Sequence, residues 1–342
     1  MTEGAGDLML ALHELLLRMA GQVPDAALTT ARDHLAEQRL AEAAGAVVTT
    51  GVDHQIPITE TDLQLLAALV PGGRTAEWPV VVSPESITLP PDLEFAPTIA
   101  DSAGNTPLLL DLTADADPLD SADQAAVAAA RGVPGGDALW RAWRREPTAQ
   151  DRPVRVYLLL VAADPHDLPA ACAQVQRALA DSGVEHPQVE AFHHRSVLPR
   201  YHQLARSCSA LLWAAADAHP VSVARVYDAY HPATGGQFSA DRPALSDGEE
   251  MQRVLDYLDG GTILLHTEAR ESDPFDEGAG LVVPLSFRTD GWWIWTDAVG
   301  YFLRTYALSP DDELLAHIRV RGYLLPESDP VAEHRALARL LS

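Results

Sequence analysis

The chain has 342 residues, of which 47% are hydrophobic, and its 49 acidic against 24 basic residues give a formal net charge of −25. This balance excludes nucleic acid as a partner, because neutralising phosphate groups requires a basic face. All of the basic residues are arginines, so Schiff-base chemistry, a pyridoxal phosphate anchor and a phosphate-loop lysine are excluded as well.

The longest apolar runs, such as residues 156–163, are far shorter than the roughly 18 to 20 residues that span a bilayer, and no targeting segment is recognised. We therefore expect a cytoplasmic protein without a membrane segment. Cys172 and Cys208 are too few for a disulfide framework and are expected to be free thiols. The absence of lysine beside abundant alanine and arginine is typical of GC-rich actinobacterial genes.

Residues 1–72 are predicted to form a helical module. Residues 8–20, 25–38 and 39–50 follow helical periodicity, and Thr59 with Asp62 has the spacing of a capping box that begins a further helix. The leucines of residues 8–20 occupy more faces than a solvated helix needs, which indicates a helix covered by the fold or by a partner. Self-association through this module is therefore one hypothesis. The acidic balance disfavours a helix-turn-helix.

Residues 73–150 are interpreted as a connecting segment that is rich in proline and aspartate and contains short strands. Trp140 and Trp143 have helical spacing, which predicts one packed helical face flanked by arginines. The segment also holds a run of acids that we interpret as a solvated loop rather than a calcium site, because no glycine-centred loop with a closing glutamate is present. These acids are Asp101, Asp111, Asp115, Asp117, Asp120 and Asp123.

Residues 151–342 are predicted to form a mixed α/β domain, because strand-like and helix-like runs alternate along them. The expected helices cover 168–183, 199–207 and 249–261, and the expected strands cover 154–164, 188–194, 210–216, 221–230 and 262–267. The predicted fold class is therefore α+β or α/β. A helical N-terminal module precedes a mixed-sheet domain, which ends in a β-hairpin and helices.

The hairpin is predicted from Asp290–Gly291, which lies between residues 281–289 and 292–296 and suits a type I′ turn. In the second strand Trp292 and Ile294 face one side, while Trp293 and Trp295 face the other. One pair is expected in the core. The other pair must be covered by a helix or by a partner, because adjacent exposed indoles are unusual on a monomer.

Two helices are predicted to follow the hairpin. Thr296 suits an N-cap, and a second helix is expected from Ser309 with Pro310 at its first helical position. The first helix carries an apolar stripe, so the motif is interpreted mainly as architecture. A direct partner-binding role is the alternative for four aromatic residues: Trp293, Trp295, Tyr301 and Tyr306.

Residues 286–319 resemble the tail of small bacterial immunity-type domains, which bind and neutralise toxins. The shared pattern is an Asp-Gly turn, W-x-W, an aromatic-rich helix and a second helix that begins with proline and an acid. The matching residues are Asp290, Gly291, Trp293, Trp295, Tyr301, Leu303, Pro310 and Glu313. The resemblance covers about a tenth of the chain and implies protein binding without catalysis.

An acidic stretch precedes the hairpin. Residues 241–277 hold 11 acids and three arginines, which would steer a basic protein towards the hairpin. We interpret residues 268–278 as a solvated loop rather than an acid/base pair, because no apolar neighbours raise a carboxyl pKa. The acidic candidates for partner binding are Glu271, Asp273, Asp276 and Glu277.

The chain contains no motif of known chemistry, neither G-x-S-x-G nor H-E-x-x-H nor G-x-G-x-x-G. His193, His194 and His202 are the candidates for a metal or catalytic site, but their spacing favours surface or strand-edge histidines. Residues 164–167 follow the first strand of the mixed domain, where α/β sheets bind ligands. They lack the glycines of a phosphate loop, so a helix-start cap is preferred, and no cofactor or metal is predicted.

The leading hypothesis is a non-enzymatic protein of the immunity or assembly-factor type that binds a basic protein through acidic loops and exposed aromatics. The first alternative is an enzyme or ligand-binding protein whose site lies in the mixed α/β domain. The second alternative is a structural subunit of a homomeric assembly, which the apolar first helix favours.

Overall fold

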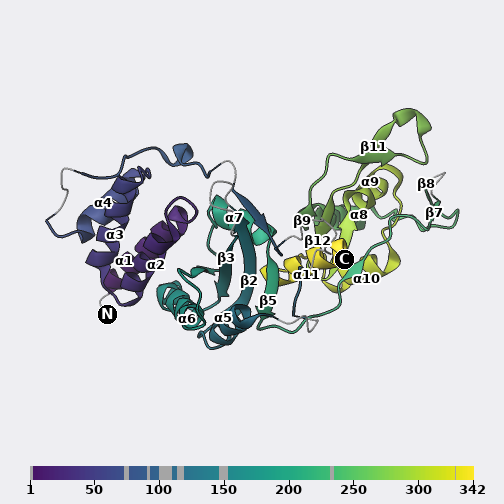
Figure 1. Ribbon diagram of the computed structural model, residues 1–342. Coiled ribbons are helices and arrows are strands. Elements are labelled where there is room, and N and C mark those ends of the chain that lie inside the picture. The colour runs from purple at the N-terminus through teal and green to yellow at the C-terminus, as the bar shows by residue number, and fades with distance from the viewer. Residues whose placement is uncertain are drawn as a thin grey trace. The chain divides into compact units, whose positions relative to one another are not determined.

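A computed structural model describes residues 3–72, 77–90, 93–99, 110–113, 119–145, 153–231, 235–327 and 329–342. The chain divides into two compact units, Met1–Asp217 and Ala218–Ser342 (Figure 1). Both units contain helices and sheet, so the predicted α+β class with an N-terminal helical region is confirmed. Among the helices described, none is both long enough and apolar enough to cross a membrane.

Unit 1 begins with the predicted helical module, formed by α1 (Glu3–Met19), α2 (Asp25–Ala36), α3 (Leu40–Asp53) and α4 (Glu60–Leu69). The capping box is present, since Thr59 accepts from the amide of Asp62 and the Asp62 carboxylate accepts from that of Thr59. Leu12, Leu15 and Leu16 of α1 are each 1% exposed or less and belong to one core with α2, α3 and α4. Much of the leucine-rich surface of α1 is thus covered within the unit, and self-association through this module stays a prediction.

A five-stranded sheet follows in the same unit. β3 (Val154–Val161) lies between β2 (Gly136–Arg145), which is antiparallel to it, and β4 (Gln188–His193), which is parallel to it. β1 (Glu94–Ala96) and β5 (Ala210–Ala214) both pair with the other edge of β2 and are antiparallel to it. β4 is therefore an edge strand.

The predicted helix around Trp140 and Trp143 is wrong, because these residues lie in β2. Residues 138–144 of β2 are all buried, since the strand is covered on both faces and paired along both edges. Such a strand loses the apolar and polar alternation that identifies a half-buried one. Successive side chains of a strand point to opposite faces, so Trp140 and Trp143, which are three positions apart, lie on opposite faces of the sheet.

Helices cover both faces of this sheet (Figure 1). α5 (Ser121–Arg131) and α6 (Leu168–Asp181) pack on one face in a core with Tyr157, Leu159 and Val161 of β3. α7 (Arg200–Ser207) packs on the other face, where Tyr201 and Val156 join the core of the helical module. The unit also has two short 3-10 turns, η1 (Pro84–Ser86) and η2 (Pro165–Asp167). Within the predicted helix-start cap, Asp164 caps η2 by accepting from His166 N, whereas Asp167 precedes α6 without a side-chain capping bond.

The predicted solvated acidic loop is corrected for two of its members. Asp120 caps α5 and pairs with Arg155, and Asp123, 1% exposed, accepts from Arg141 and Tyr157. Both acids hold α5 to the sheet, because their cationic and hydroxyl partners lie on β2 and β3. The side chain of Asp111 accepts from Thr113, and three other members, Asp101, Asp115 and Asp117, lie outside the described residues.

Unit 2 has its own four-stranded sheet, in the order β6-β13-β12-β9. Its strands are β6 (Ser222–Val223), β9 (Thr262–Leu265), β12 (Phe287–Thr289) and β13 (Trp293–Thr296). Two smaller ladders pair β7 (Ala229–His231) with β8 (Gly235–Gln237) and β10 (Arg270–Ser272) with β11 (Leu281–Pro284). The helical elements are α8 (Gly248–Gly260), η3 (Glu277–Ala279), α9 (Asp297–Tyr306), α10 (Asp312–Val320) and α11 (Pro330–Leu341).

The hairpin of β12 and β13 is confirmed, but its turn is not of type I′. Gly291 has a φ of +88°, whereas Asp290 is not among the residues with positive φ, and a type I′ turn requires positive φ at both. Thr289 pairs with Ile294, so four residues separate the paired positions. The Asp290 carboxylate accepts from the amides of Trp292 and Trp293, at 2.9 and 2.8 Å, and thereby holds the longer turn.

Two further predictions in unit 2 are corrected. The strand expected over residues 221–230 is reduced to β6 and the start of β7. The helix expected from Ser309 begins at Asp312, because the Asp311 side chain accepts from Glu313 N as its cap, while Ser309 N donates to Pro243 O. Thr296 precedes α9 as predicted, without a capping bond from its hydroxyl.

The two units do not coincide with the three predicted segments. α5 and β2 fall in the expected connecting segment of residues 73–150, and β2 pairs with β3 over most of its length. β3, α6, β4, α7 and β5 therefore belong with the helical module in unit 1, and the later part of the expected mixed domain forms unit 2. The proline-rich residues between β2 and β3 do not form a domain boundary, because these two strands pair with each other.

Candidate functional site

Asp273 joins several of the predicted partner-binding residues. Its side chain is 1% exposed, and its Oδ2 accepts hydrogen bonds from the hydroxyls of Tyr301 and Tyr306 at 2.8 and 2.7 Å. Its Oδ1 accepts from Phe275 N at 2.9 Å. The tyrosines lie on α9 and Asp273 follows β10, so the tertiary fold brings together two stretches that the sequence analysis proposed separately.

The Asp273 carboxylate is charged at neutral pH. Burial by itself raises the pKa of Asp273, but the hydrogen bonds from Phe275, Tyr306 and Tyr301 outweigh it and lower that pKa. The hydrogen bond to Asp273 in turn raises the pKa of Tyr306 to about 12 and shifts that of Tyr301 in the same direction. The charged Asp273 carboxylate and the two neutral tyrosine hydroxyls are therefore suited to holding side chains in place rather than to acid/base catalysis.

Phe275 lies beside this group and is 52% exposed. Its ring stacks on that of Phe238, with centroids 5.4 Å apart, and lies 4.7 Å from the ring of Tyr306. Because Asp273 holds the amide of Phe275, the backbone that presents the open ring is fixed. The exposed ring of Phe275 and its contacts with Phe238 and Tyr306 together present an apolar aromatic surface.

Acidic side chains surround the aromatic rings. The Glu271 carboxylate accepts from the hydroxyl of Tyr227, whose ring lies 5.2 Å from that of Phe238. Asp276 is exposed, and its carboxylate accepts from Gly278 N at 3.0 Å. We call this group the Phe275 surface and define it as Phe238, Glu271, Phe275, Asp276, Tyr301 and Tyr306, with the buried Asp273 holding it together. The side chain of Glu277, which begins η3, lies outside the described residues.

Trp293 and Trp295 do not belong to the Phe275 surface. Trp295 is 1% exposed, and its indole nitrogen donates to Leu258 O, so it is a core residue. Trp293 is partly buried and packs against the same core near His317. The exposed tryptophan of the hairpin is Trp292, which is 44% exposed and stacks on His219 at 3.7 Å. A buried Trp295 cannot meet a partner.

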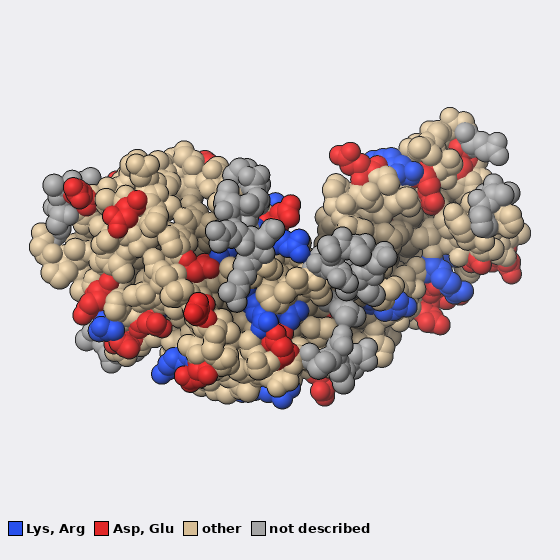
Figure 2. All heavy atoms as spheres, in the orientation of Figure 1, with Lys and Arg blue, Asp and Glu red and all other residues tan. Residues whose placement is uncertain are grey.

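Arginines from other parts of the chain neutralise some of the acids in residues 241–277. Glu250 pairs with Arg319 and Asp259 pairs with Arg304, and both arginines come from later helices. Asp247 accepts from Glu249 N and Glu250 N as the cap of α8. Figure 2 shows acidic groups spread over both units among uncharged surface on the face drawn. The acidity of this face is therefore not gathered into one continuous patch.

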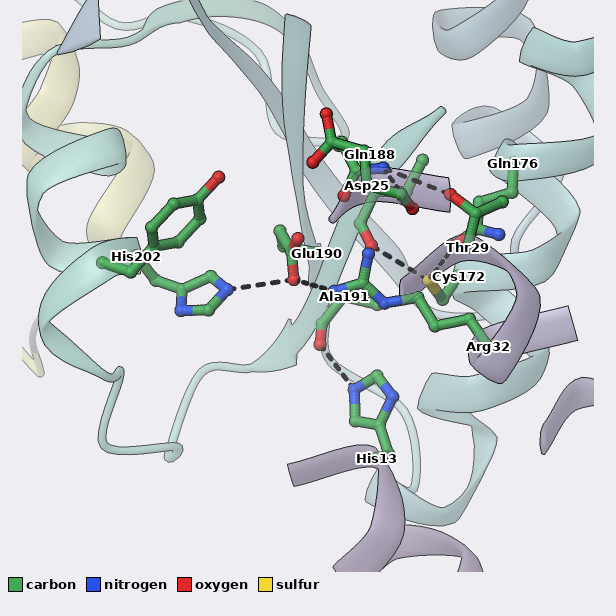
Figure 3. Close-up of polar contacts among 12 residues, drawn as sticks. His13, Asp25, Thr29, Arg32, Cys172, Gln176, Gln188, Glu190, Ala191 and His202 are labelled. Carbon is green, nitrogen blue, oxygen red and sulfur yellow. Dashed lines mark hydrogen bonds and ion pairs between the residues drawn. The ribbon is translucent and has the colours of Figure 1, made fainter. Parts of the chain in front are cut away.

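A second polar cluster lies inside unit 1, between α2, β4 and α7. Figure 3 shows Glu190 between His202 on one side and Arg32 on the other. The Arg32 guanidinium pairs with Glu190 Oε2, and His202 Nε2 donates to the same oxygen at 3.0 Å. All three side chains are 2% exposed or less, so a substrate cannot reach them.

This buried cluster is strongly polarised. Burial raises the pKa of Glu190, but Arg32 and His202 outweigh it and lower the pKa to about 2, so the carboxylate is charged. His13 donates to Ala191 O at 2.8 Å, and burial lowers the pKa of His13 to about 4. The thiol of Cys172 donates to Val189 O at 3.0 Å. Two carbonyls of the edge strand β4 are thus capped by side chains, which protects that edge.

The fold separates His202, which is buried and not at the surface or a strand edge as expected, from the other two candidate histidines. His202 lies in the buried cluster, while the rings of His193 and His194 lie 4.0 Å apart at the end of β4. No group of three or more metal-binding side chains that could hold an ion occurs among the described residues.

Sequence reasoning missed Phe275, Phe238, Arg32 and Glu190. Phe275 carried a signal, because it is a large apolar residue inside the acidic run of residues 268–278. Glu190 carried one too, as an acid within the apolar strand of residues 188–194. Arg32 and Phe238 carried none, since their partners lie far away in the sequence.

No family model matches the chain, and neither a curated protein nor a solved structure matches it. The resemblance of residues 286–319 to immunity-type domains therefore stays a prediction.

Proposed function

We propose that unit 2 binds a basic segment of another protein through the Phe275 surface. The observation that carries this proposal is the ring of Phe275, which is 52% exposed although its backbone is held by a buried carboxylate. A fixed aromatic ring costs little conformational entropy when a partner covers it. Aromatic side chains of this kind are common anchors of protein interfaces.

The charges around the ring favour a cationic partner. Arginine and lysine side chains bind to aromatic faces within about 6 Å of the ring centre, and carboxylates beside the ring strengthen that attraction. Asp276 is exposed beside Phe275, and the whole chain carries a formal charge of −25. Long-range attraction would therefore increase the association rate with a basic chain.

The proposed class is a non-enzymatic binding protein of the immunity or assembly-factor type. The resemblance of residues 286–319 to immunity-type domains supports it, through the Asp-Gly turn, W-x-W, the aromatic-rich helix and the helix that begins with proline and an acid, and it implies protein binding without catalysis. A cytoplasmic location forms part of the proposal, since a reducing compartment suits the two free cysteines. Nucleic acid is not proposed as a partner, because of the charge balance.

The proposal is tested by panning the immobilised full chain against a library of displayed random peptides. We expect enrichment of peptides in which arginine or lysine stands beside an apolar residue. Phe275→Ala should weaken binding of the enriched peptides at least tenfold, which is typical of an interface anchor. Trp292→Ala, which removes another exposed aromatic side chain of the same unit, is the matched control and should leave binding unchanged.

Ionic strength separates the acidic and aromatic contributions. Affinity for an enriched peptide should fall as salt rises from about 0.05 to 0.5 M, because exposed charges are screened over a Debye length. Enrichment of neutral or acidic peptides, or full binding by Phe275→Ala, would contradict the proposal.

A further inference from the structure

A pocket of about 560 Å³ opens in unit 1 at the carboxyl ends of β3 and β4. His193, the last residue of β4, lines it together with the loop that follows, and Pro165 and Leu168 line it from the connection after β3. α1 forms the remaining wall. Ligands of α/β sheets bind in the crevice beyond the carboxyl ends of the parallel strands, and pockets of roughly 300 to 1,000 Å³ suit small molecules.

The walls of this pocket are largely apolar. Leu10 and Leu17 come from α1, Leu168 is the first residue of α6, and Leu198 and Pro199 come from the loop before α7. Leu17 and Leu168 are buried in the protein, so this part of the wall is fixed by the core. The apolar body of a ligand would remove from water the partly exposed side chains of Leu10 on one side and of Leu198 and Pro199 on the other.

Two arginines and one glutamate are the charged side chains that line the pocket. Arg195 is exposed and forms no ion pair with any residue that the structure describes. Arg18 also lines the pocket and pairs with Asp62, whereas Glu14 is the acid of the lining. The α6 helix begins at Leu168, so its positive dipole end lies at the same wall.

The imidazoles of the lining add polarity without charge at neutral pH. His13 is 1% exposed, and its Nε2 donates to Ala191 O, whereas its Nδ1 has no partner among the described residues. Burial lowers the pKa of His13 to about 4, and burial and the neighbouring His194 and Arg195 lower that of His193. The imidazoles therefore leave the guanidinium of Arg195 as the unpaired positive charge of the lining, beside the exposed carboxylate of Glu14.

We propose that this pocket binds a small monocarboxylate with an apolar body. The carboxylate lies at Arg195 by the mouth, and the body lies between α1, Leu168 and Leu198. This site is independent of the Phe275 surface, which belongs to unit 2, so either proposal can fail without the other.

Three ligands of one chain length test the proposal on the full-length protein by isothermal titration. Decanoate, used below its micellar range, should bind with a dissociation constant on the order of 0.1 mM. Decanol, which lacks the charge, and decylammonium, which reverses it, should bind about fivefold more weakly, because an exposed pair contributes about 1 kcal/mol. Equal binding of all three, or no saturation by decanoate up to about 1 mM, would overturn the proposal.

Two variants locate the binding. Arg195→Gln should weaken decanoate about fivefold and leave decanol unchanged, whereas Arg131→Gln, an exposed arginine at the end of α5, should change neither. Ser196→Trp places an indole on an exposed loop position of the lining and should abolish binding of decanoate and decanol together. Circular dichroism checks that each variant is folded. Unchanged decanoate binding by folded Arg195→Gln would remove the arginine from the site, and unchanged binding by Ser196→Trp would remove the pocket.

Discussion

At the scale of single residues, Glu190 shows how a buried charge connects elements. Glu190 lies on β4 and is fully buried. Arg32 of α2 and His202 of α7 both donate to its Oε2. The three side chains come from a helix of the N-terminal module, a strand and a later helix (Figure 3). A buried ion pair of this type is a weak source of net stability, but loss of one partner leaves the other charge buried and unpaired.

Glu190→Gln should therefore destabilise unit 1 by about 3 to 5 kcal/mol, because Arg32 keeps its charge in the core. Urea unfolding followed by circular dichroism measures this loss. Glu185→Gln, the same substitution at an exposed position before β4, should change stability by less than about 0.5 kcal/mol. Replacing both partners, Arg32→Met with Glu190→Gln, should recover part of the loss. A single variant as stable as the control would contradict the role given to this pair.

At the scale of elements, the hairpin of β12 and β13 depends on one backbone conformation. Gly291 has a φ of +88°, and a Cβ at this position would lie 3.0 Å from Cβ of Ala332 in α11. Both the conformation and the contact oppose a side chain. Asp290 completes the turn, since its carboxylate also accepts from the Tyr257 hydroxyl at 2.5 Å and from His317 Nε2 at 2.6 Å.

Gly291→Ala should destabilise unit 2 by about 1 to 2 kcal/mol, because alanine is strained at positive φ and crowds α11. The matched control is Gly248→Ala in the first turn of α8, where no atom lies within 4 Å of the added Cβ. That variant should be as stable as the original chain or up to about 1 kcal/mol more stable. Chemical denaturation of both variants gives the comparison, and an equal effect at the two glycines would argue against the turn geometry.

At the scale of the whole molecule, protonation of the buried groups in unit 1 sets its response to acid. The pKa of His13 is about 4 in the fold against 6.5 for an ordinary histidine, so the unfolded chain binds a proton first as pH falls. The contribution of His13 to the free energy of unfolding is therefore lost as the pH falls from 6.5 to about 4. The pKa of Glu190 is about 2 against 4.5, so its contribution is lost between pH 4.5 and pH 2.

Unit 1 should accordingly be less stable at about pH 5 than at about pH 7 by roughly 2 kcal/mol, most of it from His13. Urea unfolding at the two pH values measures the difference. In His13→Gln, whose amide can still donate to Ala191 O, most of this difference should disappear. A pH dependence that is the same in the variant would mean that other groups cause it.

Local signals were sufficient for the helices and for several strands. The capping box of Thr59 and Asp62, the helix closed by Gly183 and the Asp-Gly hairpin each depend on residues a few positions apart, and each is present. β2 was missed because pairing along both edges and burial on both faces remove alternation from its sequence. The Phe275 surface was predicted only in parts, because Tyr301 and Tyr306 lie 28 and 33 residues from Asp273.

The sequence by itself determined the lack of lysine, the α+β class and most helix positions, because composition is read directly and periodicity and capping act over short distances along the chain. Only the tertiary structure decided which acids are paired, which tryptophan is exposed, and that Arg32, Glu190 and His202 share one buried site. These outcomes depend on side chains that come from distant segments. Burial and hydrogen bonding between such segments are properties of packing, so no local pattern records them.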